Sequence, residues 1–372
     1  MNLQPLNGGG EVYTHAMTRA LADAGGKVTL YAHPGNRLWD DLPRPGIDRV
    51  DAADEAEFLS RLPSTRSVVV AQGPISRDCA ALLGERHAFV QFAHMPVVAG
   101  RSADGFRCAR LVATVSRYCV DLLRDAGVER LYPEPLYGTA EAQRGDDAPI
   151  VAHSPYRWDR RKFRDVALGA LEPVSRRLRA PVRFERRPGV TLGVVSLLSP
   201  IKQFPILFSH LAPHLARHPQ VNVEVFGEGG YAQVRDIRRA LAPLGEGARF
   251  WGYQRNVHAI YPQLDYLLSG LPEKEALGLN VLEAQLCGTP VLAPDAPPFT
   301  ETVLPGRSGF LYRDPREDEG SDFARVLDEI VAGRPRPDPR VEAVEHLRGF
   351  SYEALVQRVR PFLRRLEELA PR

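Results

Sequence analysis

Short apolar runs alternate along the chain with longer segments in which apolar residues recur at helical spacing. In the first half, the apolar runs cover residues 28–32, 67–71, 89–94 and 111–116. The segment before the first run carries Val12, Ala16, Leu21 and Ala22 at helical spacing. Compact apolar runs joined by amphipathic helices are typical of parallel strands covered on both faces. The pattern therefore predicts an α/β fold with a doubly wound parallel sheet.

The second half of the chain repeats this pattern. Apolar runs cover residues 190–198, 221–227, 248–253 and 265–269, and residues 352–369 form a helical segment with one apolar face. A chain of 372 residues exceeds what one hydrophobic core usually holds. We therefore expect two α/β domains, residues 1–185 and 186–350, followed by a C-terminal helix within residues 351–372.

Composition narrows the class of protein. With 44% apolar and 25% charged residues and a net charge of +2, the chain is globular and has no overall attraction to nucleic acid. Four cysteines, Cys79, Cys108, Cys119 and Cys287, lack metal-ligand spacing, so the sequence predicts reduced thiols and no metal site. No apolar run is long enough to span a bilayer, and no signal peptide is apparent. We expect a cytoplasmic protein, attached at most to the surface of a membrane.

Two glutamates mark the most informative stretch, EALGLNVLEAQLCGTP at residues 275–290. If a helix begins near Asn280 with an Asx-type cap, then Val281, Leu282 and Glu283 fill its first turn and their backbone N–H groups are free. Such a helix end attracts phosphate. Glu275 would precede the helix, so that both carboxylates could face one ligand that carries hydroxyls. This layout suits a nucleotide sugar, whereas an ordinary acidic helix start is the alternative.

Two further features of the first half could contribute to a site. Gly8, Gly9 and Gly10 precede a predicted helix, where glycine lets the backbone approach a ligand closely. They do not form the GxGxxG fingerprint, which argues against a nicotinamide dehydrogenase. His94 ends the apolar run 89–94, and ligands collect at the carboxyl ends of parallel strands. A histidine that is satisfied within a loop or the core is the alternative.

The sequence from residue 275 onward resembles the donor-binding signature of group 1 glycosyltransferases, family GT4, which have the GT-B fold. The similarity rests on EALGLNVLEA at 275–284, CGTPVLA at 287–293, TETV at 300–303 and GRSGFLY at 306–312. It is strongest over residues 190–312 and weaker before them. The resemblance implies two Rossmann-like domains facing across a cleft, with a final helix that crosses back onto the first domain.

The resemblance also implies a role for each candidate residue. Glu275 would hold hydroxyls of the donor sugar, His94 would contact the hexose, and Lys202 would grip the donor diphosphate. The other donor-binding positions that it implies are Gly9, Gly10, Tyr253, Leu279, Asn280, Val281, Leu282 and Glu283. Tyr253 would lie against the base and Glu283 would hold the ribose. No metal or other cofactor is implied.

The implied activity is transfer of a hexosyl unit from a nucleotide diphosphate sugar to a hydroxyl acceptor, with retention of configuration. One position departs from the family pattern, because Leu197 stands where an arginine usually binds the diphosphate. Leucine cannot neutralise phosphate. Either an arginine from elsewhere replaces it, or diphosphate binding is weaker, or the chain is a non-catalytic relative that binds nucleotide sugars or a partner. A sugar-nucleotide epimerase is a further alternative. The sequence names neither the sugar and base nor the acceptor.

Residues 157–187 are rich in arginine. Apolar residues Phe163, Val166, Ala167, Ala170 and Leu171 recur at helical spacing within this stretch, which predicts an amphipathic basic helix. The helix could meet an anionic membrane surface or a lipid-linked acceptor. The alternative is a solvated helix without a partner.

Overall fold

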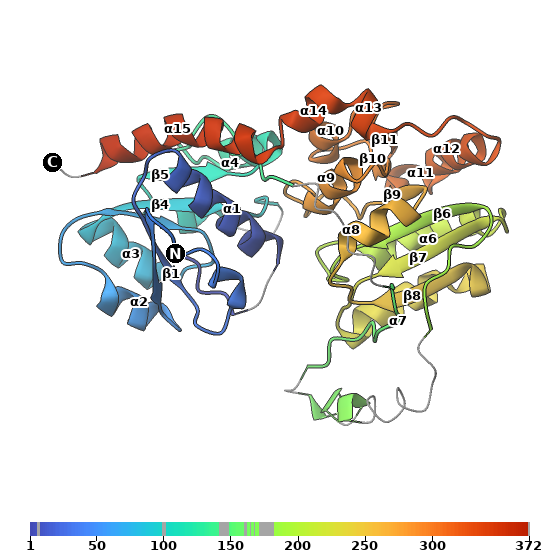
Figure 1. Cartoon of the computed structure of the whole chain (residues 1–372), viewed down its shortest axis with the longest axis horizontal. Coiled ribbons are helices and arrows are strands. Elements are labelled where there is room, and N and C mark those ends of the chain that lie inside the picture. The colour runs from blue at the N-terminus through green and yellow to red at the C-terminus, as the bar shows by residue number, and fades with distance from the viewer. Residues whose placement is uncertain are drawn as a thin grey trace. The chain divides into compact units, whose positions relative to one another are not determined.

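The computed structural model describes residues 1–5, 8–98, 102–140, 149–159, 162–163, 165–166, 168–170 and 182–370. The chain divides into two compact units (Figure 1). Unit 1 comprises Met1–Ala140 and Arg348–Arg372, and unit 2 comprises Glu141–Leu347. The division thus falls well before the predicted boundary at residue 185. The reason is that residues 150–152 pair with 182–184 through the bonds from Ala152 N to Val182 O (2.9 Å) and from Phe184 N to Ile150 O (2.8 Å), and Phe184 packs against Phe226 of unit 2.

Five parallel strands lie in the described residues of unit 1. They are β1 (Val28–Ala32), β2 (Ile47–Asp51), β3 (Val68–Ala71), β4 (Ala88–Ala93) and β5 (Leu111–Thr114). All four apolar runs predicted as strands in this half of the chain are confirmed. Strands β1 and β2 pair separately from the order β3-β4-β5.

The first two residues bridge the two groups of strands in unit 1. Asn2 N donates to Tyr31 O on β1 (3.0 Å) and Gln72 N donates to Met1 O (2.9 Å), while the Met1 ammonium donates to Val70 O on β3 (2.6 Å). Residues 1 and 2 thus form a short bridge in the position of a strand between β1 and β3. The sheet therefore begins between β1 and β3 and grows outward in both directions.

The helices of unit 1 cover this sheet. They are α1 (Gly9–Asp23), α2 (Glu55–Arg61), α3 (Arg77–Arg86), α4 (Arg117–Asp125) and the last helix α15 (Tyr352–Leu369). Figure 1 shows α15 running beside α1, although hundreds of residues separate them in the sequence. It buries Leu355, Val359, Phe362 and Leu366, and Phe362 meets Tyr132 edge-on at 5.0 Å between ring centroids. The predicted apolar face of this helix is confirmed.

The part of unit 2 that the structure describes has a sheet of six parallel strands in the order β11-β10-β9-β6-β7-β8. They are β6 (Val190–Val195), β7 (Val221–Phe226), β8 (Ala248–Gly252), β9 (Tyr266–Leu268), β10 (Val291–Pro294) and β11 (Gly309–Tyr312). The chain starts at β6 in the middle, proceeds to β8, and then returns to the other side of β6. The strand order therefore reverses between β6 and β9, which is where doubly wound sheets bind ligands.

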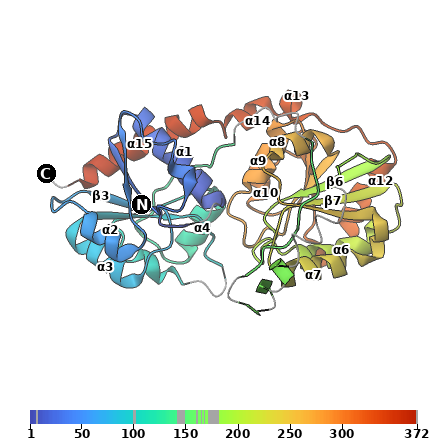
Figure 2. The same cartoon turned by 60° about the horizontal axis from the view of Figure 1, so that its bottom comes forward.

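Helices cover both faces of this sheet (Figure 2). One face packs against α6 (Phe204–Leu215), α7 (Tyr231–Ala240) and α12 (Ser321–Val331), whose buried residues share one core cluster. The other packs against α8 (Val257–Ile260), α9 (Leu279–Leu286) and α10 (Phe299–Thr302). The remaining short helices are α11 (Pro315–Asp318), α13 (Pro339–Glu342) and α14 (Val344–Arg348).

The arginine-rich stretch is described only in part. Residues 163, 165, 166 and 168–170 are helical, whereas Arg160, Arg161, Arg164, Arg176, Arg177 and Arg179 lie outside the described residues. Arg186 pairs with Asp265 at 2.7 Å and Arg187 pairs with the buried Glu224 at 3.0 Å. These two arginines therefore belong to the framework of unit 2 and are not available to a membrane.

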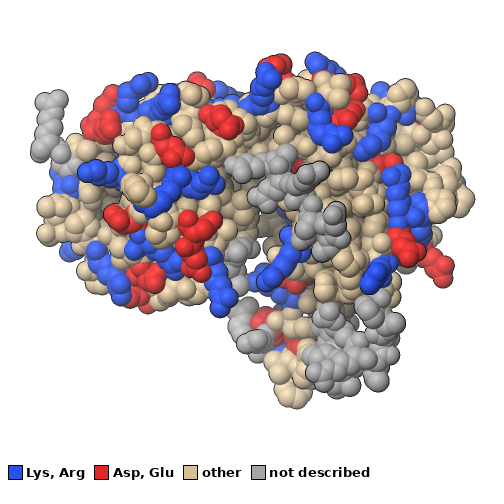
Figure 3. Space-filling view, in the orientation of Figure 1, with Lys and Arg blue, Asp and Glu red and all other residues tan. Residues whose placement is uncertain are grey.

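Charge is mixed over the surface. Figure 3 shows basic and acidic side chains interspersed on the face that it draws, in keeping with the small net charge of +2. Within the part of the chain that the structure describes, no helix combines the length and the apolar character that crossing a bilayer requires.

Candidate functional site

The candidate residues of unit 2 gather where its strand order reverses. Lys202 follows β6 and Glu275 follows β9, and the Lys202 Nζ forms an ion pair with the Glu275 Oε2. Their side chains are 22% and 15% exposed, so the pair is screened less than a surface ion pair. The structure thus brings together a cation and a carboxylate that are far apart in the sequence. They meet at the carboxyl ends of β6 and β9, where doubly wound sheets bind ligands.

The backbone fixes the position of Lys202. Its amide donates to Ser199 O (3.1 Å) and its carbonyl accepts from Leu271 N (3.3 Å). A Cβ atom at Gly270 would lie 2.4 Å from that carbonyl oxygen. Because only glycine fits at this position, the loop after β9 can pack directly on the loop that carries Lys202.

Helix α9 (Leu279–Leu286) begins two residues earlier than predicted and without the predicted cap. Gly278 is the N-cap residue, in a left-handed conformation with φ of 83°, and no side chain caps the helix. Asn280 lies within the helix, and its Nδ2 donates to Val195 O at the end of β6 (3.1 Å). The prediction of an Asx-type cap at Asn280 was therefore wrong, because this side chain ties α9 to β6.

The free backbone donors at this helix end also differ from the prediction. The amides of Val281 and Leu282 both donate to Gly278 O, at 2.9 and 3.3 Å. The amides of Leu279 and Asn280 precede the first residue that has an intrahelical acceptor. Phosphate binding at this helix would therefore use Leu279 and Asn280, and the prediction of free N–H groups at Val281 and Leu282 was wrong.

Glu283 lies in the second turn of α9, not in the first as predicted. Its Oε2 accepts a hydrogen bond from the Tyr261 hydroxyl at 2.8 Å. Burial raises the pKa of the Glu283 carboxyl, while the Tyr261 hydroxyl and the Lys202 charge partly offset the rise. Lys202 therefore acts on both glutamates, and Tyr261 is a member of the cluster that no local sequence signal indicated.

The residues after β8 differ in their availability to a ligand. Tyr253 is 55% exposed, as a contact to a base would require. The side-chain amide Nε2 of its neighbour Gln254 donates to Val151 O and Trp251 O, both at 2.8 Å. Trp251 is buried and donates its indole N–H to Glu224 at 2.7 Å. Of these three side chains, therefore, Tyr253 is the one left to meet a ligand.

A second group of polar residues lies in unit 1, where the bridge formed by Met1 and Asn2 meets β3. His94 and Gln72 follow β4 and β3, and the His94 Nε2 donates to the Gln72 Oε1 at 2.9 Å. A Cβ at Gly10 would lie 3.9 Å from the His94 Cγ, so the structure brings the glycine segment next to His94. Gln72 was not predicted, although its place after a strand is the same signal that indicated His94.

The glycine segment is more regular than a ligand-binding turn. Gly8 is extended, with φ of −147°, and Gly9 and Gly10 already belong to α1. The positive φ values that glycine permits are therefore not used here, and the missing side chain of Gly10 instead leaves room for His94. Burial lowers the pKa of His94 to about 4, and hydrogen bonding to the backbone of Gln72 partly offsets this fall. The ring is thus neutral at pH 7, with its proton on Nε2 and Nδ1 left as an acceptor.

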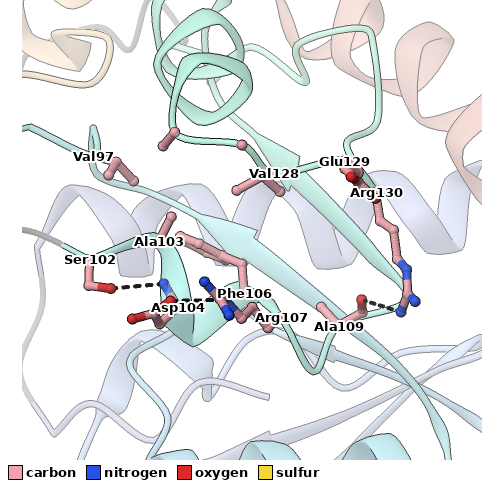
Figure 4. A pocket seen from close by; sticks show the side chains of 12 residues that line it. Val97, Ser102, Ala103, Asp104, Phe106, Arg107, Ala109, Val128, Glu129 and Arg130 are labelled. Atoms are coloured by element: carbon pink, nitrogen blue, oxygen red, sulfur yellow. Dashed lines mark hydrogen bonds and ion pairs between the residues drawn. The ribbon is translucent and has the colours of Figure 1, made fainter.

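A cavity of about 490 Å³ lies elsewhere in unit 1, at the amino end of β5 (Figure 4). Val97, Phe106 and Val128 contribute apolar surface, and Arg107, which pairs with Asp104 at 2.9 Å, contributes charge. The predicted site residues lie outside this cavity. It also lies at the opposite end of the strands from Gln72 and His94. The cavity and the candidate site are therefore separate features.

A metal-binding cluster is not apparent. Among the described residues, no group of three or more histidine, cysteine, aspartate and glutamate side chains is arranged to hold an ion. Cys287, near Glu283, has a thiol whose pKa is raised to about 11 by burial and by the charge of Glu283. This thiol is protonated at neutral pH and is a poor nucleophile.

Comparison with known proteins shows what the chain is similar to. Residues 189–332 match the family model described as "Glycosyl transferases group 1". That span contains Lys202, Glu275 and Glu283, together with Asn280 and Tyr261. Over its full length the chain is similar to Anabaena HepE solved with UDP and glucose, with a TM-score of 0.68, 17% identity and 97% coverage of both chains. The chain has the GT-B fold.

A further solved structure and two curated proteins are also similar to the chain. Sucrose-phosphate synthase from Thermosynechococcus elongatus superimposes with a TM-score of 0.65 at 15% identity, covering 96% of this chain and 94% of that one. D-inositol 3-phosphate glycosyltransferase of Rhodococcus erythropolis is 28% identical over 178 residues, or 45% of this chain and 39% of that protein. The protein of the same name from Corynebacterium efficiens is 30% identical over 194 residues, which are 47% of this chain and 44% of that protein. The chain therefore spans less than half the length of these curated relatives.

The predicted GT-B fold and the predicted resemblance to group 1 glycosyltransferases are thus confirmed. The roles of the individual GT-B site residues stay predictions.

Proposed function

We propose that the protein is a glycosyltransferase that moves a hexosyl unit from a nucleotide diphosphate sugar to a hydroxyl acceptor, with retention of configuration. The observation that carries this proposal is the placement of Lys202, Glu275 and Glu283 at the reversal of strand order in unit 2. This cluster lies within the residues that match group 1 glycosyltransferases. The acceptor would be a growing glycan, a glycolipid or a polysaccharide.

The cluster suits departure of a nucleoside diphosphate. Transfer from an anomeric carbon requires that negative charge developing on the leaving phosphate be stabilised. Lys202 and the amides of Leu279 and Asn280 would supply this stabilisation. Glu283 would bind the ribose hydroxyls and Glu275 the sugar hydroxyls, because carboxylates accept hydrogen bonds from such groups.

The residues of unit 1 would contribute to sugar recognition. His94 is neutral and presents Nδ1 as an acceptor, so it can accept a hydrogen bond from a hydroxyl but cannot donate a proton to a leaving group at pH 7.

Tyr253 of unit 2 would stack on the nucleobase. Retention would follow from attack by the acceptor on the same face that the diphosphate leaves.

The test is a donor panel with product analysis. The protein is incubated with UDP-, GDP- and ADP-sugars and simple hydroxyl acceptors, and the anomeric configuration of the product is read by NMR. Transfer with the donor configuration preserved is expected. Transfer with inversion would contradict the mechanism, and failure of every donor to react, together with failure of every nucleotide to bind, would contradict the proposed function.

A non-catalytic nucleotide-sugar-binding protein is the second candidate, and Leu197 favours it. This side chain is 45% exposed and stands where a phosphate-binding arginine is expected. Calorimetry separates the two candidates. Nucleotide binding without turnover, for any donor and acceptor pair, would support the binding protein.

The proposed reaction uses no resident metal. Lys202 and the amides of α9 would do the work that a divalent cation does in metal-dependent transfer. Initial rates should therefore be unchanged after treatment with EDTA. A rate that falls with EDTA and returns with Mg²⁺ or Mn²⁺ would overturn this part of the proposal.

We also propose that the protein works in the cytoplasm and that the basic stretch 157–187, apart from the paired Arg186 and Arg187, contacts anionic lipid. Phe163 is 89% and Val166 47% exposed, next to the exposed Lys162, and such a combination favours an anionic membrane surface. Sedimentation with anionic vesicles should exceed that with neutral vesicles, and Phe163→Ser should reduce it, whereas Val341→Ser, another exposed apolar position at 73%, should not. Equal sedimentation with both kinds of vesicle would contradict the proposal.

A further inference from the structure

The donor site of unit 2 is short of positive charge. A nucleoside diphosphate carries two or more negative charges, and Lys202 already pairs with Glu275. At residue 197 a leucine takes the place of the expected arginine, and its side chain is 45% exposed. A site that binds a diphosphate strongly therefore needs a second cation from another part of the chain.

The segment before β6 runs along the carboxyl end of β7, next to the loop that holds Leu197. Gly229, just after β7, donates to Pro155 O at 2.9 Å and accepts from Arg157 N at 2.8 Å. The same glycine forms parallel bridges with both Tyr156 and Leu198. Gly229 thus lies between the two segments, paired with Tyr156 on one side and with Leu198 of the loop after β6 on the other. The backbone of Arg157 is one residue past the Tyr156 bridge.

Stacked aromatic rings show which way this segment faces. The Tyr156 and Trp158 rings stack at 5.0 Å between centroids, and Tyr156 stacks on Tyr231 at 5.7 Å. Both rings therefore lie on one side of the segment, and alternation along an extended backbone places Arg157 on the other.

The loop after β6 shows the same alternation. Tyr156 packs against the core cluster that contains Leu198, and Leu198 is buried whereas Leu197 is exposed. Leu197 therefore lies on the side away from that cluster, as Arg157 does. The two residues share one side of the carboxyl edge.

Arg157 is also available for a ligand. Among the residues that the structure describes, it has no ion-pair partner, and its side chain is exposed. The other described arginines of this stretch that face unit 2, Arg186 and Arg187, are already paired with Asp265 and Glu224. Arg157 precedes the span that matches the family model.

We propose that Arg157 binds the diphosphate of the donor and replaces the cation that Leu197 lacks. The proposal rests on the proposed function, since it assumes that unit 2 binds a nucleoside diphosphate. A guanidinium forms paired, charge-assisted hydrogen bonds with phosphate oxygens. The arginine therefore reaches the same ligand from a different loop.

The experiment measures the dissociation constants of UDP, GDP and ADP by calorimetry on the full chain. Arg157→Ala should raise the dissociation constant of the nucleotide that binds the wild type by about tenfold or more, as loss of a charged hydrogen bond does. Adding Leu197→Arg to this variant should restore affinity to within about threefold. Arg183→Ala, which removes another exposed arginine of the same stretch, is the matched control and should bind as the wild type does.

The outcomes separate the two proposals. If the wild type binds none of the three nucleotides, the proposed function fails. If the wild type binds one of them and Arg157→Ala binds it equally, the role of Arg157 is refuted. If Arg157→Ala binds weakly, melts as the wild type does and is not rescued by Leu197→Arg, its effect does not come from replacing the missing cation and the proposal is likewise overturned.

Discussion

Lys202 has two carboxylates within its electrostatic reach. It pairs directly with Glu275 and its charge acts on Glu283, whose pKa is nevertheless raised by burial. A diphosphate entering this site would compete with Glu275 for the ammonium group. On the proposed function, nucleotide binding and catalysis would therefore depend on the same ion pair.

Replacing Lys202 should weaken nucleotide binding. Lys202→Ala removes a cation and leaves the carboxylate of Glu275 unpaired beside the phosphates, so we expect the dissociation constant of the nucleoside diphosphate to rise at least about tenfold. Calorimetry measures it, with Lys27→Ala, an exposed lysine of unit 1, as the control. An unchanged dissociation constant would show that the phosphates bind elsewhere.

Replacing Glu275 should affect turnover more than nucleotide binding. Glu275→Gln keeps the shape of the side chain but removes the charge that would hold the sugar hydroxyls, so kcat should fall about 100-fold or more, while the nucleoside diphosphate binds within about threefold of the wild type. Glu273→Gln is the matched control, because Glu273 pairs with Arg316 at 2.9 Å. A near-wild-type kcat in the Glu275 variant would refute its role.

His94 should make the stability of unit 1 depend on pH. Its pKa is lowered to about 4 in the folded protein, against about 6.5 for an unfolded chain. The folded state binds fewer protons between these values, so stability is lost as the pH falls from about 6.5 towards 4, and is unaffected by this group above that window. In His94→Asn, the free energy of unfolding should fall less steeply over the window, by at most about 1.4 kcal/mol per pH unit. Denaturant unfolding at several pH values measures the slope, and equal slopes would contradict the assignment.

At the scale of elements, α9 depends on the left-handed residue that precedes it. Gly278 has φ of 83°, and a Cβ there would lie 3.3 Å from both Phe299 Cε1 and Val281 Cγ2. Its carbonyl accepts from the amides of Val281 and Leu282, so this one residue sets where the helix begins. The site residues Leu279, Asn280 and Glu283 are placed by that start.

Gly278→Ala should therefore cost stability and affinity together. The left-handed conformation alone costs about 1–2 kcal/mol for a residue with a Cβ, and the close contacts add to it. Gly127→Ala is the control, since Gly127 has φ of 77° and open space around a Cβ, so it should show the conformational cost alone. Chemical denaturation and nucleotide calorimetry should show a larger loss of stability for Gly278→Ala and weaker nucleotide binding in that variant only. Equal effects of the two substitutions would contradict this account of α9.

At the scale of the whole molecule, both units follow one plan. In each, the chain begins in the middle of a parallel sheet and proceeds to one side before it returns to the other. In unit 2, Lys202 and Glu275 follow the two strands where this reversal takes place, and in unit 1, His94 follows β4, the neighbour of β3. The last helix, α15, belongs to unit 1, so that unit is completed only after unit 2 has been made.

Removing the central contact of α15 should destabilise unit 1 selectively. Phe362 is fully buried, and Phe362→Ala should cost about 3–5 kcal/mol by leaving a cavity. Arg360→Ala, an exposed position on the same helix, should be close to neutral. Calorimetric melting with and without nucleotide should show one transition lowered by Phe362→Ala and another that is raised by nucleotide but unaffected by the substitution. A uniform shift of every transition would argue against separate units.

The sequence by itself determined most of the strands and the final helix, because burial on both faces gives parallel strands a continuous apolar pattern that can be read locally. It did not indicate β2, in which only Ile47 is buried. It also determined that Glu275 precedes a helix and that His94 ends a strand. The choice of His94 follows from the rule that ligands collect at the carboxyl ends of parallel strands. The unpredicted Gln72 was accessible to the same rule.

Only the tertiary structure decided how these residues meet. Asn280 reads locally as a helix cap, yet its side chain bonds to Val195, far back in the sequence. Tyr261 and Glu283, and Lys202 and Glu275, are likewise paired across long separations. The path of Arg157 along β7 has no local signature either. Such contacts depend on strand order and backbone hydrogen bonds between distant segments, which periodicity along a chain does not encode.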